Sequence, residues 1–267
     1  MHFTKAHAYG NDFLYADATE ARDASLPALA RELCDRHAGI GADGLIVFTR
    51  TASGASMQLL NADGSAAEVS GNGVRGLAAI LLKEIGGNAA AITIETDAGP
   101  KRLTRIDRSG SRQTFVAAMG APRDVRQVAV RAAGEPLEAV VMDFGNPQCV
   151  VLGSLPDAAR FERLGPALER HEMFHAGTNV EFAAVEHRDR VRILIWERGV
   201  GPTQSSGTGS CAALVAAASF GGASRAAEVV APGGAQRVEW RADGVYLTGW
   251  AEVLVEGEWL RDLPPRA

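Results

Sequence analysis

The stretch SGNGVRGLAA at residues 70–79 returns, with small changes, as SGTGSCAALVAA at residues 206–217. Each copy begins with Ser-Gly-polar-Gly and continues into a run of small and apolar residues, which predicts a helix behind a serine N-cap. Ser206 follows Ser70 by 136 residues, about half of the 267-residue chain. The repetition predicts a duplicated architecture in which the two copies share one site.

Three further pairs of landmarks keep this spacing. YGN returns as FGN, GADG corresponds to AGTN, and NADGS corresponds to ERGVG. The residues concerned are Asn11 and Asn146, Gly44 and Asn179, and Asn61 and Glu197, each pair 135 or 136 residues apart. Because four landmarks keep their order and spacing, we expect two similar α/β halves.

Apolar periodicity and β-branched residues predict the other elements. The helices are expected at residues 26–34, 73–85, 157–171 and 209–220, with a kink or break near Gly165 and Pro166. The strands are expected at residues 43–49, 91–96, 101–106, 139–144, 179–185 and 190–197. A hairpin turn is expected at residues 242–244.

The bulk composition predicts a soluble, cytoplasmic protein. Hydrophobic residues make up 46% and charged residues 22% of the chain, which is ordinary for a globular protein. The net charge of −5 and the lack of a Lys/Arg run do not favour nucleic acid or an anionic membrane as a partner. The N-terminal stretch lacks a signal-peptide pattern, and no apolar stretch is long enough to span a bilayer. Three scattered cysteines, Cys34, Cys149 and Cys211, indicate a reducing compartment without a disulfide framework.

The two Ser-Gly-x-Gly phrases also predict an anion site. A helix N-terminus exposes backbone N–H groups beside the positive end of the helix dipole, so two such ends could hold one small carboxylate ligand. Neither phrase has the third glycine of a dinucleotide fingerprint. Helix capping alone explains Ser70 or Ser206 when each is taken singly. Because the two serines occupy symmetric places, contact with a ligand is at least as well supported as capping. A serine-hydrolase site is disfavoured because the chain has no G-x-S-x-G motif.

Other polar residues at repeat-related places have both a plain and a functional interpretation. The asparagines can be turn formers or can form a polar cage around a substrate. Glu197 and Arg198 can be a surface ion pair, or can bind an ammonium and a carboxylate group. The six histidines show no metal-ligand spacing, so we expect no metal site.

Taken together, these motifs resemble the diaminopimelate epimerase family. The resemblance rests on GNDF, DRHAGIGADG, NADGS followed by SGNGVR, GNPQCV, GTNVEF and ERGVGPTQSSGTGSCAA, which occur in this order between Gly10 and Ala213. The stretch YLTGWAEVLVEGEW at residues 246–259 is similar to the C-terminal strands of the family.

The resemblance implies an α/β (α+β) fold of two pseudo-symmetric domains, each a curled, mostly antiparallel sheet around a central helix. The domains would comprise residues 1–115 with 253–267, and residues 116–252, with the active site in the cleft between them. Family members need no cofactor, usually form homodimers, and interconvert LL- and meso-diaminopimelate in lysine biosynthesis. In them one cysteine thiolate removes the α-proton and a cysteine thiol returns a proton on the other face.

The resemblance places Ser70 and Ser206 at the two catalytic cysteine positions. A thiol has a pKa near ~8.5 that a helix N-terminus lowers, whereas a dipole effect of about 1 kcal/mol cannot turn a hydroxyl into an alkoxide. Gln148 stands where the family usually has histidine, and Gly44 stands where some members have glutamine. The residues that match the family's substrate-binding set are Asn11, Asn61, Gly71, Asn72, Asn146, Asn179, Glu197, Arg198, Gly207 and Thr208.

Three explanations of the serines stay open. The chain can be a serine branch that still moves a Cα proton, or a variant whose two bases were replaced to trap substrate. It can also belong to a subgroup with other chemistry, such as a related amino-acid racemase or dehydratase, or a catalytically silent amino-acid-binding homologue. The expected ligand is in each case a small zwitterionic amino acid.

Overall fold

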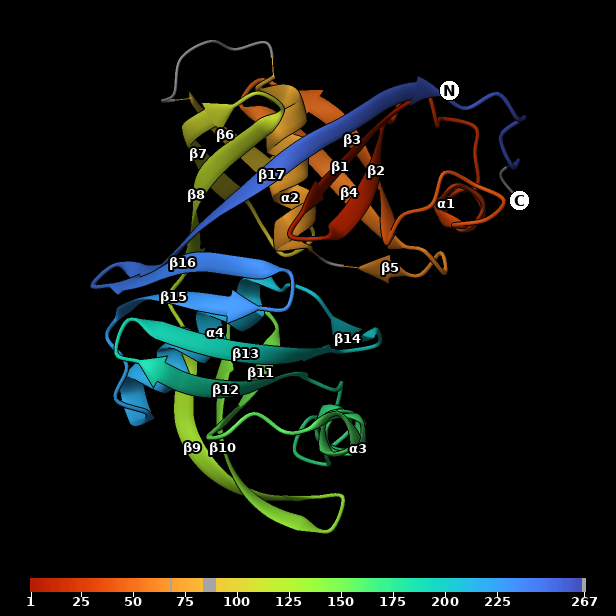
Figure 1. Ribbon diagram of the computed structural model, residues 1–267. Helices are drawn as coiled ribbons and strands as arrows, with labels where there is room; N and C mark the ends of the chain where they lie inside the picture. The colour runs from red at the N-terminus through yellow and green to blue at the C-terminus, as the bar shows by residue number, and fades with distance from the viewer. Residues whose placement is uncertain (68, 84–89, 266–267) are drawn as a thin grey trace. The chain divides into compact units, whose positions relative to one another are not determined.

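The computed structural model describes residues 1–267 except 68, 84–89 and 266–267, and strands dominate it (Figure 1). The chain divides into two compact units, Met1–Ala117 with Gly249–Ala267, and Ala118–Thr248. Each unit combines a mostly antiparallel sheet with two helices. The predicted two-domain α+β fold is therefore confirmed.

The strands of the first unit form a closed ring. Its elements are β1 (His2–Ala8), β2 (Asn11–Asp17), α1 (Leu26–Cys34), β3 (Gly44–Thr51), β4 (Gly54–Asn61), β5 (Ala66–Ala67), α2 (Gly71–Leu81), β6 (Ala90–Glu95), β7 (Lys101–Ser109) and β8 (Arg112–Gly120). The pairing runs β17–β1–β2–β3–β4–β6–β7–β8, and β8 pairs in turn with β17 (Gly244–Glu258). Figure 1 shows α2 enclosed by these strands.

The second unit repeats this order of pairings. Its elements are β9 (Arg123–Ala132), β10 (Glu135–Asp143), β11 (Pro147–Leu152), α3 (Ala158–Glu169), β12 (Asn179–His187), β13 (Arg190–Glu197), β14 (Gly201–Thr203), α4 (Gly207–Phe220), β15 (Ala226–Ala231) and β16 (Gly234–Arg241). The antiparallel, parallel and antiparallel pairs β1–β2, β2–β3 and β3–β4 correspond to β10–β11, β11–β12 and β12–β13. The later parallel pair β4–β6 likewise corresponds to β13–β15. The internal repeat predicted from the sequence is thus present in the topology.

The helices that follow the two serines, α2 and α4, are largely buried. The side chains from Cys211 to Ala217 in α4 are all inaccessible to solvent, and they pack against apolar residues of β12, β13, β15 and β16. A helix that is apolar on every side needs such enclosure, because it has no polar face for water. By contrast α1 buries one face only, through Leu29, Ala30, Leu33 and Cys34.

Two long-range side chains complete the C-terminal end of α2. Gln113 Nε2 donates to the carbonyl of Ala79 at 2.7 Å, and Arg105 Nη1 donates to the carbonyl of Leu82 at 2.8 Å. Arg105 also donates to Gln113 Oε1 at 2.9 Å. The last carbonyls of a helix have no partner within it, so these contacts satisfy groups that would otherwise be buried unpaired.

Several predicted boundaries move by a few residues. Helices α2 and α4 begin at Gly71 and Gly207, two residues before their predicted starts, because Ser70 and Ser206 are the N-caps. The predicted end of the first of these helices, at residue 85, lies outside the described residues. No break occurs near Gly165, because α3 continues through Pro166 with Leu164 and Leu168 buried on either side of it; the alternative of a kink stays a prediction. The expected hairpin turn joins β16 to β17.

Gly76 in α2 allows Tyr15 to approach the helix. A Cβ at position 76 would lie 2.0 Å from the Tyr15 hydroxyl oxygen, which donates to the carbonyl of Gly73 at 3.0 Å. We therefore expect Gly76→Ala to lower the free energy of unfolding by about 1–3 kcal/mol, although alanine is the better helix former. Urea denaturation of Gly76→Ala, Tyr15→Phe and the double variant checks this. An unfolding free energy that Gly76→Ala leaves unchanged or raises contradicts the prediction.

None of the helices in the described part of the chain is long and apolar enough to cross a membrane. Cys34, Cys149 and Cys211 are buried and are not in disulfides. Burial raises the pKa of Cys34 and of Cys149 to about 12. Both thiols are therefore protonated at neutral pH.

Candidate functional site

Ser70 is the N-cap of α2. Its backbone is extended, with φ −126° and ψ 122°, and its Oγ accepts a hydrogen bond from the Gly73 N–H at 3.2 Å. Gly71 and Asn72 form the first turn of the helix. The Asn72 side-chain oxygen accepts from the guanidinium of Arg75, which is itself buried. The capping interpretation of Ser70 is confirmed, and its role towards a ligand stays a prediction.

Ser206 repeats this arrangement at the start of α4. Its Oγ accepts from the Gly209 N–H at 3.2 Å, with φ −135° and ψ 131°. Its carbonyl accepts from the Ser210 hydroxyl at 2.7 Å, and the Gln236 amide donates to Ser210 Oγ at 3.3 Å. Each cap occupies the N–H of the third helical residue, and helix geometry leaves the earlier N–H groups without an acceptor inside the helix. The first turn of each helix is thus a place where a carboxylate can accept hydrogen bonds.

Asn179 joins two turns of the second unit. Its side-chain oxygen accepts from the backbone N–H of Arg198 at 3.0 Å, and its amide donates to the Pro147 carbonyl at 3.4 Å. Glu197 ends β13 immediately before Arg198. The carboxylate and guanidinium of the ERG motif are therefore attached to a turn that Asn179 positions.

Asn146 connects the same region to the first turn of α4. Its amide donates to Thr208 Oγ1 at 3.5 Å, and its oxygen accepts from the Gln148 amide at 2.8 Å. Gln148 is fully buried and lies opposite Asn179 in the parallel β11–β12 pairing. The structure thus brings together Asn146, Asn179, Arg198 and Thr208, four of the residues predicted to bind substrate.

The asparagines of the first unit behave less uniformly. Asn61 donates to Ser65 Oγ at 2.9 Å, and its carbonyl accepts from the Gly64 N–H at 2.9 Å, so it closes the NADGS turn. Asn11 begins β2, and its buried side-chain oxygen has no hydrogen-bond partner among the residues that the structure describes. The binding role of Asn11 stays a prediction.

Gly44 has a structural explanation. A Cβ at position 44 would lie 2.6 Å from the Leu60 carbonyl oxygen and 3.2 Å from the Phe13 ring. The glutamine found at this place in some members of the resembled family therefore does not fit this chain without a shift of the strands.

The DRHAGIGADG motif builds a charged cluster that the sequence did not reveal. Asp12 forms ion pairs with Lys5 at 2.9 Å and with Arg36 at 2.8 Å. Arg36 also forms an ion pair with Asp43 at 2.8 Å. Burial raises the pKa of Asp12, but the hydrogen bonds from Arg36 and Lys5 outweigh this and hold it below its usual range. Burial raises the pKa of Asp43. The cluster connects the loop after α1 to the start of β2 beside Asn11.

Glu169 is a second residue that sequence reasoning missed. Its carboxylate accepts from the Trp196 indole N–H at 2.7 Å and from the Gly199 N–H at 2.9 Å, and its carbonyl accepts from the Thr178 N–H at 3.1 Å. It thereby holds both turns that carry Asn179 and Arg198. The only local signal is that Glu169 follows Gly165 by four residues on one face of α3, where a Cβ on Gly165 would lie 2.5 Å from the Trp196 ring.

Glu169→Gln is expected to lower the free energy of unfolding by about 1–3 kcal/mol. The amide that replaces one carboxylate oxygen cannot accept a hydrogen bond, so either the Trp196 or the Gly199 N–H loses its partner. Urea denaturation measures the stability, and the indole N–H signal of Trp196 in an NMR spectrum reports the contact. The exposed Glu172→Gln is the control and is expected to stay within about 0.5 kcal/mol of the parent. Equal stability of the two variants contradicts the assignment.

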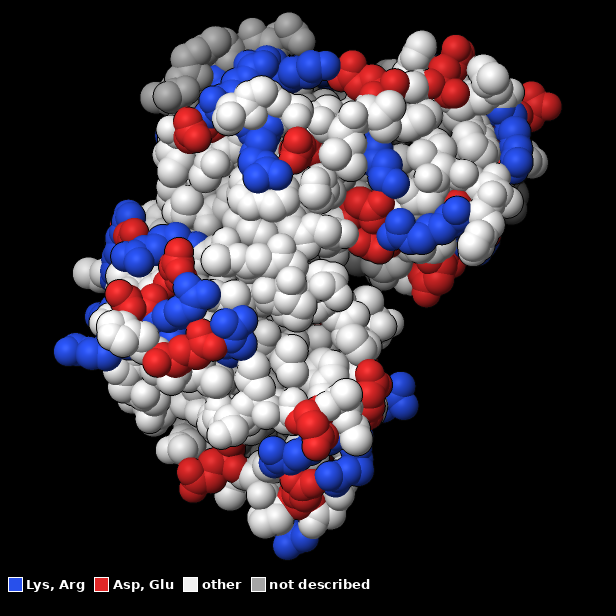
Figure 2. Space-filling model, viewed as in Figure 1, with Lys and Arg blue, Asp and Glu red and all other residues white. Residues whose placement is uncertain are grey.

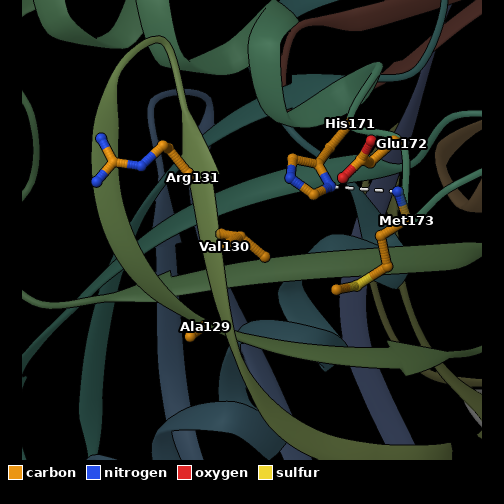
Figure 3. Close-up of a pocket in the computed structure, with 6 residues that line it drawn as sticks. All are labelled: Ala129, Val130, Arg131, His171, Glu172 and Met173. Atoms are coloured by element: carbon orange, nitrogen blue, oxygen red, sulfur yellow. Dashed lines mark hydrogen bonds between the residues drawn. The ribbon is translucent and has the colours of Figure 1, made fainter.

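A separate surface pocket of about 800 Å³ lies in the second unit (Figure 3). It is lined by Ala129, Val130, Arg131, His171, Glu172 and Met173. The His171 ring accepts from the Met173 N–H at 3.2 Å, and Arg131 donates to the Gly134 carbonyl at 2.8 Å. None of the predicted site residues belongs to this lining, so it does not coincide with the candidate site.

The charged side chains give no sign of a single-sign surface patch on the face in view or of a metal site among the described residues. Figure 2 shows Lys and Arg mixed with Asp and Glu on the face in view. Among the ion pairs of the second unit, Glu186 pairs with Arg190 and Arg192. Within the described ranges, no cluster of three or more His, Cys, Asp or Glu side chains could hold a metal ion.

Known sequences match this chain over nearly its whole length. The sequence profile of the family described as "Diaminopimelate epimerase" matches residues 3–125 and 140–254. A diaminopimelate epimerase from Desulforudis audaxviator is 39% identical over 281 residues, covering 98% of this chain and 100% of the relative. One from Synechococcus elongatus is 35% identical over 273 residues, covering 96% and 97%.

Solved structures with much lower sequence identity share the fold. A hydroxyproline epimerase from Agrobacterium vitis matches with a TM-score of 0.70 at 15% identity, covering 96% of this chain and 91% of that one. A methylitaconate-delta-isomerase matches with a TM-score of 0.64 at 12% identity, covering 96% and 95%. At these identities the likeness concerns the fold alone.

Proposed function

Because the chain belongs to the diaminopimelate epimerase family, we propose that it transfers the Cα proton of diaminopimelate without a cofactor. In this proposal Ser70 and Ser206 are the two groups that exchange a proton with Cα. The interconversion of the LL and meso forms would supply lysine biosynthesis. Homodimer formation and a cytoplasmic location stay predictions.

The observation that carries the proposal is the duplicated serine-capped helix N-terminus. Both serines occupy the same cap position, where Oγ accepts a hydrogen bond from the N–H of the third helical residue. The N–H groups and the dipole at such an end stabilise a substrate carboxylate, and also the negative charge that develops on it as Cα loses a proton. Family membership supplies the substrate class.

Polar side chains around the second cap support recognition of a zwitterion. Glu197 offers a carboxylate to an ammonium group and Arg198 offers a guanidinium to a carboxylate. Asn146 and Asn179 hold the neighbouring turns in place through the contacts described above. We assign Asn11, Asn61, Gly71, Asn72, Gly207 and Thr208 to the same binding set.

A catalytically silent amino-acid-binding protein is the second candidate. It is favoured by the environment of Ser70, which accepts from the Gly73 N–H and has the apolar Ile46 on the same side of Gly73. A hydroxyl without an adjacent base is a poor proton acceptor at neutral pH. The same site can then bind the ligand without exchanging its proton.

Incubation with LL- or meso-diaminopimelate in D₂O tests the proposal. NMR follows loss of the α-proton signal, and line broadening of the ligand in ordinary water reports binding. Exchange by the parent, with loss in Ser70→Ala/Ser206→Ala, supports the enzyme. Binding without exchange supports the silent protein, and the absence of binding by either isomer overturns both assignments of the ligand.

A further inference from the structure

Glu181 is a fully buried carboxyl group on β12, at the level of the N-terminus of α4. Its side chain has no exposed area. Alternation along β12 places Val180 and Phe182 in the apolar cluster that contains Leu164 and Leu168 of α3. Glu181 therefore faces the opposite side of the sheet, towards α4.

The carboxyl group lies beside the cap serine. A Cβ at position 209 would be 2.5 Å from Glu181 Oε1 and 3.2 Å from the Ser206 Cβ. The Gly209 N–H is itself the donor to Ser206 Oγ, at 3.2 Å. The two side chains thus lie on the same side of Gly209, and the missing side chain of this glycine leaves room for them to meet.

The immediate surroundings of Glu181 favour its neutral form. Neither of its oxygens has a hydrogen-bond partner among the residues that the structure describes. Burial, and in addition the negative charge of Glu197 on β13, raise the pKa of Glu181 well above its usual value. Burial, and in addition the charge of nearby Glu181, raise the pKa of the Cys149 thiol on β11 to about 12. A neutral carboxyl group has one O–H to donate, and a buried donor without an acceptor is unfavourable.

The first unit has no acid at the equivalent place. Ile46 precedes Glu181 by 135 residues, which is the spacing of the repeat. A Cβ at position 73 would be 2.7 Å from Ile46 Cδ1 and 3.4 Å from the Ser70 Cβ, so Ile46 stands behind Ser70 as Glu181 stands behind Ser206. In the first unit an apolar side chain fills this place against the helix. Packing alone therefore does not explain why the second unit has a buried carboxyl group there.

We propose that Glu181 is the proton partner of Ser206, which makes the two serine positions chemically unequal. The Glu181 O–H gives its proton to Ser206 Oγ while the Ser206 hydroxyl gives its own proton to the substrate. A C–H bond forms from the electron pair on Cα, and Glu181 is left as a carboxylate. The reverse sequence breaks the C–H bond and returns a proton to Glu181. The assignment to Cα chemistry rests on the proposed function, whereas the proton coupling of Glu181 and position 206 does not.

Thiol titration tests the coupling without any substrate. Ser206→Cys and Ser206→Cys/Glu181→Gln are alkylated with iodoacetamide between about pH 6 and pH 10, and mass spectrometry measures the rate at position 206. Two coupled groups titrate in two steps, so we expect a two-step rate profile for Ser206→Cys and a single step once Glu181→Gln is added. The midpoint is expected to move by at least about one pH unit.

Ser70→Cys, with and without Glu181→Gln, is the matched control. Its alkylation rate is expected to rise in one step with pH and to be unchanged by Glu181→Gln, because Ser70 lies beside the apolar Ile46. Glu181→Ile, which introduces the residue type of the first unit, serves if Glu181→Gln does not fold. Identical profiles at position 206 with and without Glu181 overturn the proposal.

Exchange of the diaminopimelate α-proton in D₂O tests the consequence for the reaction. Glu181→Gln is expected to slow exchange at least tenfold and to change its pH profile while ligand binding is retained. If the parent shows no exchange, the proposed catalytic function fails, but the alkylation profiles still decide whether Glu181 and position 206 share a proton. Exchange in Glu181→Gln at the parent rate and with the parent pH profile contradicts the role of Glu181.

Discussion

Ser70→Cys/Ser206→Cys is expected to exchange the α-proton of diaminopimelate about 10²–10⁴ times faster than the parent. A thiol with a pKa near ~8.5 ionises readily at a helix N-terminus, whereas a hydroxyl does not. General-base efficiency is greatest when the pKa of the base lies near the working pH. Both cap positions already have the extended backbone and the N–H donor that would stabilise a thiolate.

NMR in D₂O measures this gain, with Ser70→Cys and Ser206→Cys as single-variant controls. Inversion requires a proton donor and an acceptor, so each single variant is expected to gain less than the double variant. Ligand binding is expected to change little, because the backbone amides are kept. A double variant that binds diaminopimelate but exchanges it no faster than the parent shows that the cap positions are not the proton-transfer groups.

The stability of the parent relative to Glu181→Gln is expected to fall as the pH rises. The folded state raises the pKa of Glu181 above its unfolded value of about 4.3, so the folded state binds this proton more tightly. The favourable contribution is complete below that unfolded pKa and is lost as the pH rises towards the folded-state pKa. The change amounts to at most about 1.4 kcal/mol for each pH unit in this window.

Urea denaturation of both proteins between about pH 4 and pH 8 measures the difference. Glutamine cannot titrate, and the pH effects of Asp12 and Asp43 are common to both proteins and cancel. The exposed Glu172→Gln is expected to follow the parent within about 0.5 kcal/mol at every pH. A stability difference that does not vary with pH would mean that Glu181 has the same pKa in the folded and unfolded states.

The internal repeat shows how far local patterns lead. Four landmarks at a spacing of 135 or 136 residues predicted two similar halves, and the strand pairings have that order. Both serine-capped helices were predicted within two residues of their starts. Caps, periodicity and turn residues act over a few neighbouring positions, so a single sequence is sufficient to predict them.

Contacts between distant positions were not predictable in this way. The bond from Trp196 to Glu169 joins residues 27 apart, and the bond from Gln113 to the carbonyl of Ala79 joins residues 34 apart. Glu181 lies between two apolar residues of its strand, a pattern that is typical of a half-exposed polar residue. Nothing in this local pattern indicates a carboxyl group without exposed area. Such contacts depend on which strand faces which helix.

The sequence by itself therefore determined the repeat, the serine caps, the two helix N-termini with their backbone N–H groups, and the resemblance to the family. Only the tertiary structure decided that Ser206 lies beside a buried carboxyl group while Ser70 lies beside Ile46. The physical reason is that burial and long-range packing set the pKa and the partners of a side chain, and neither is encoded by the residues next to it in the chain.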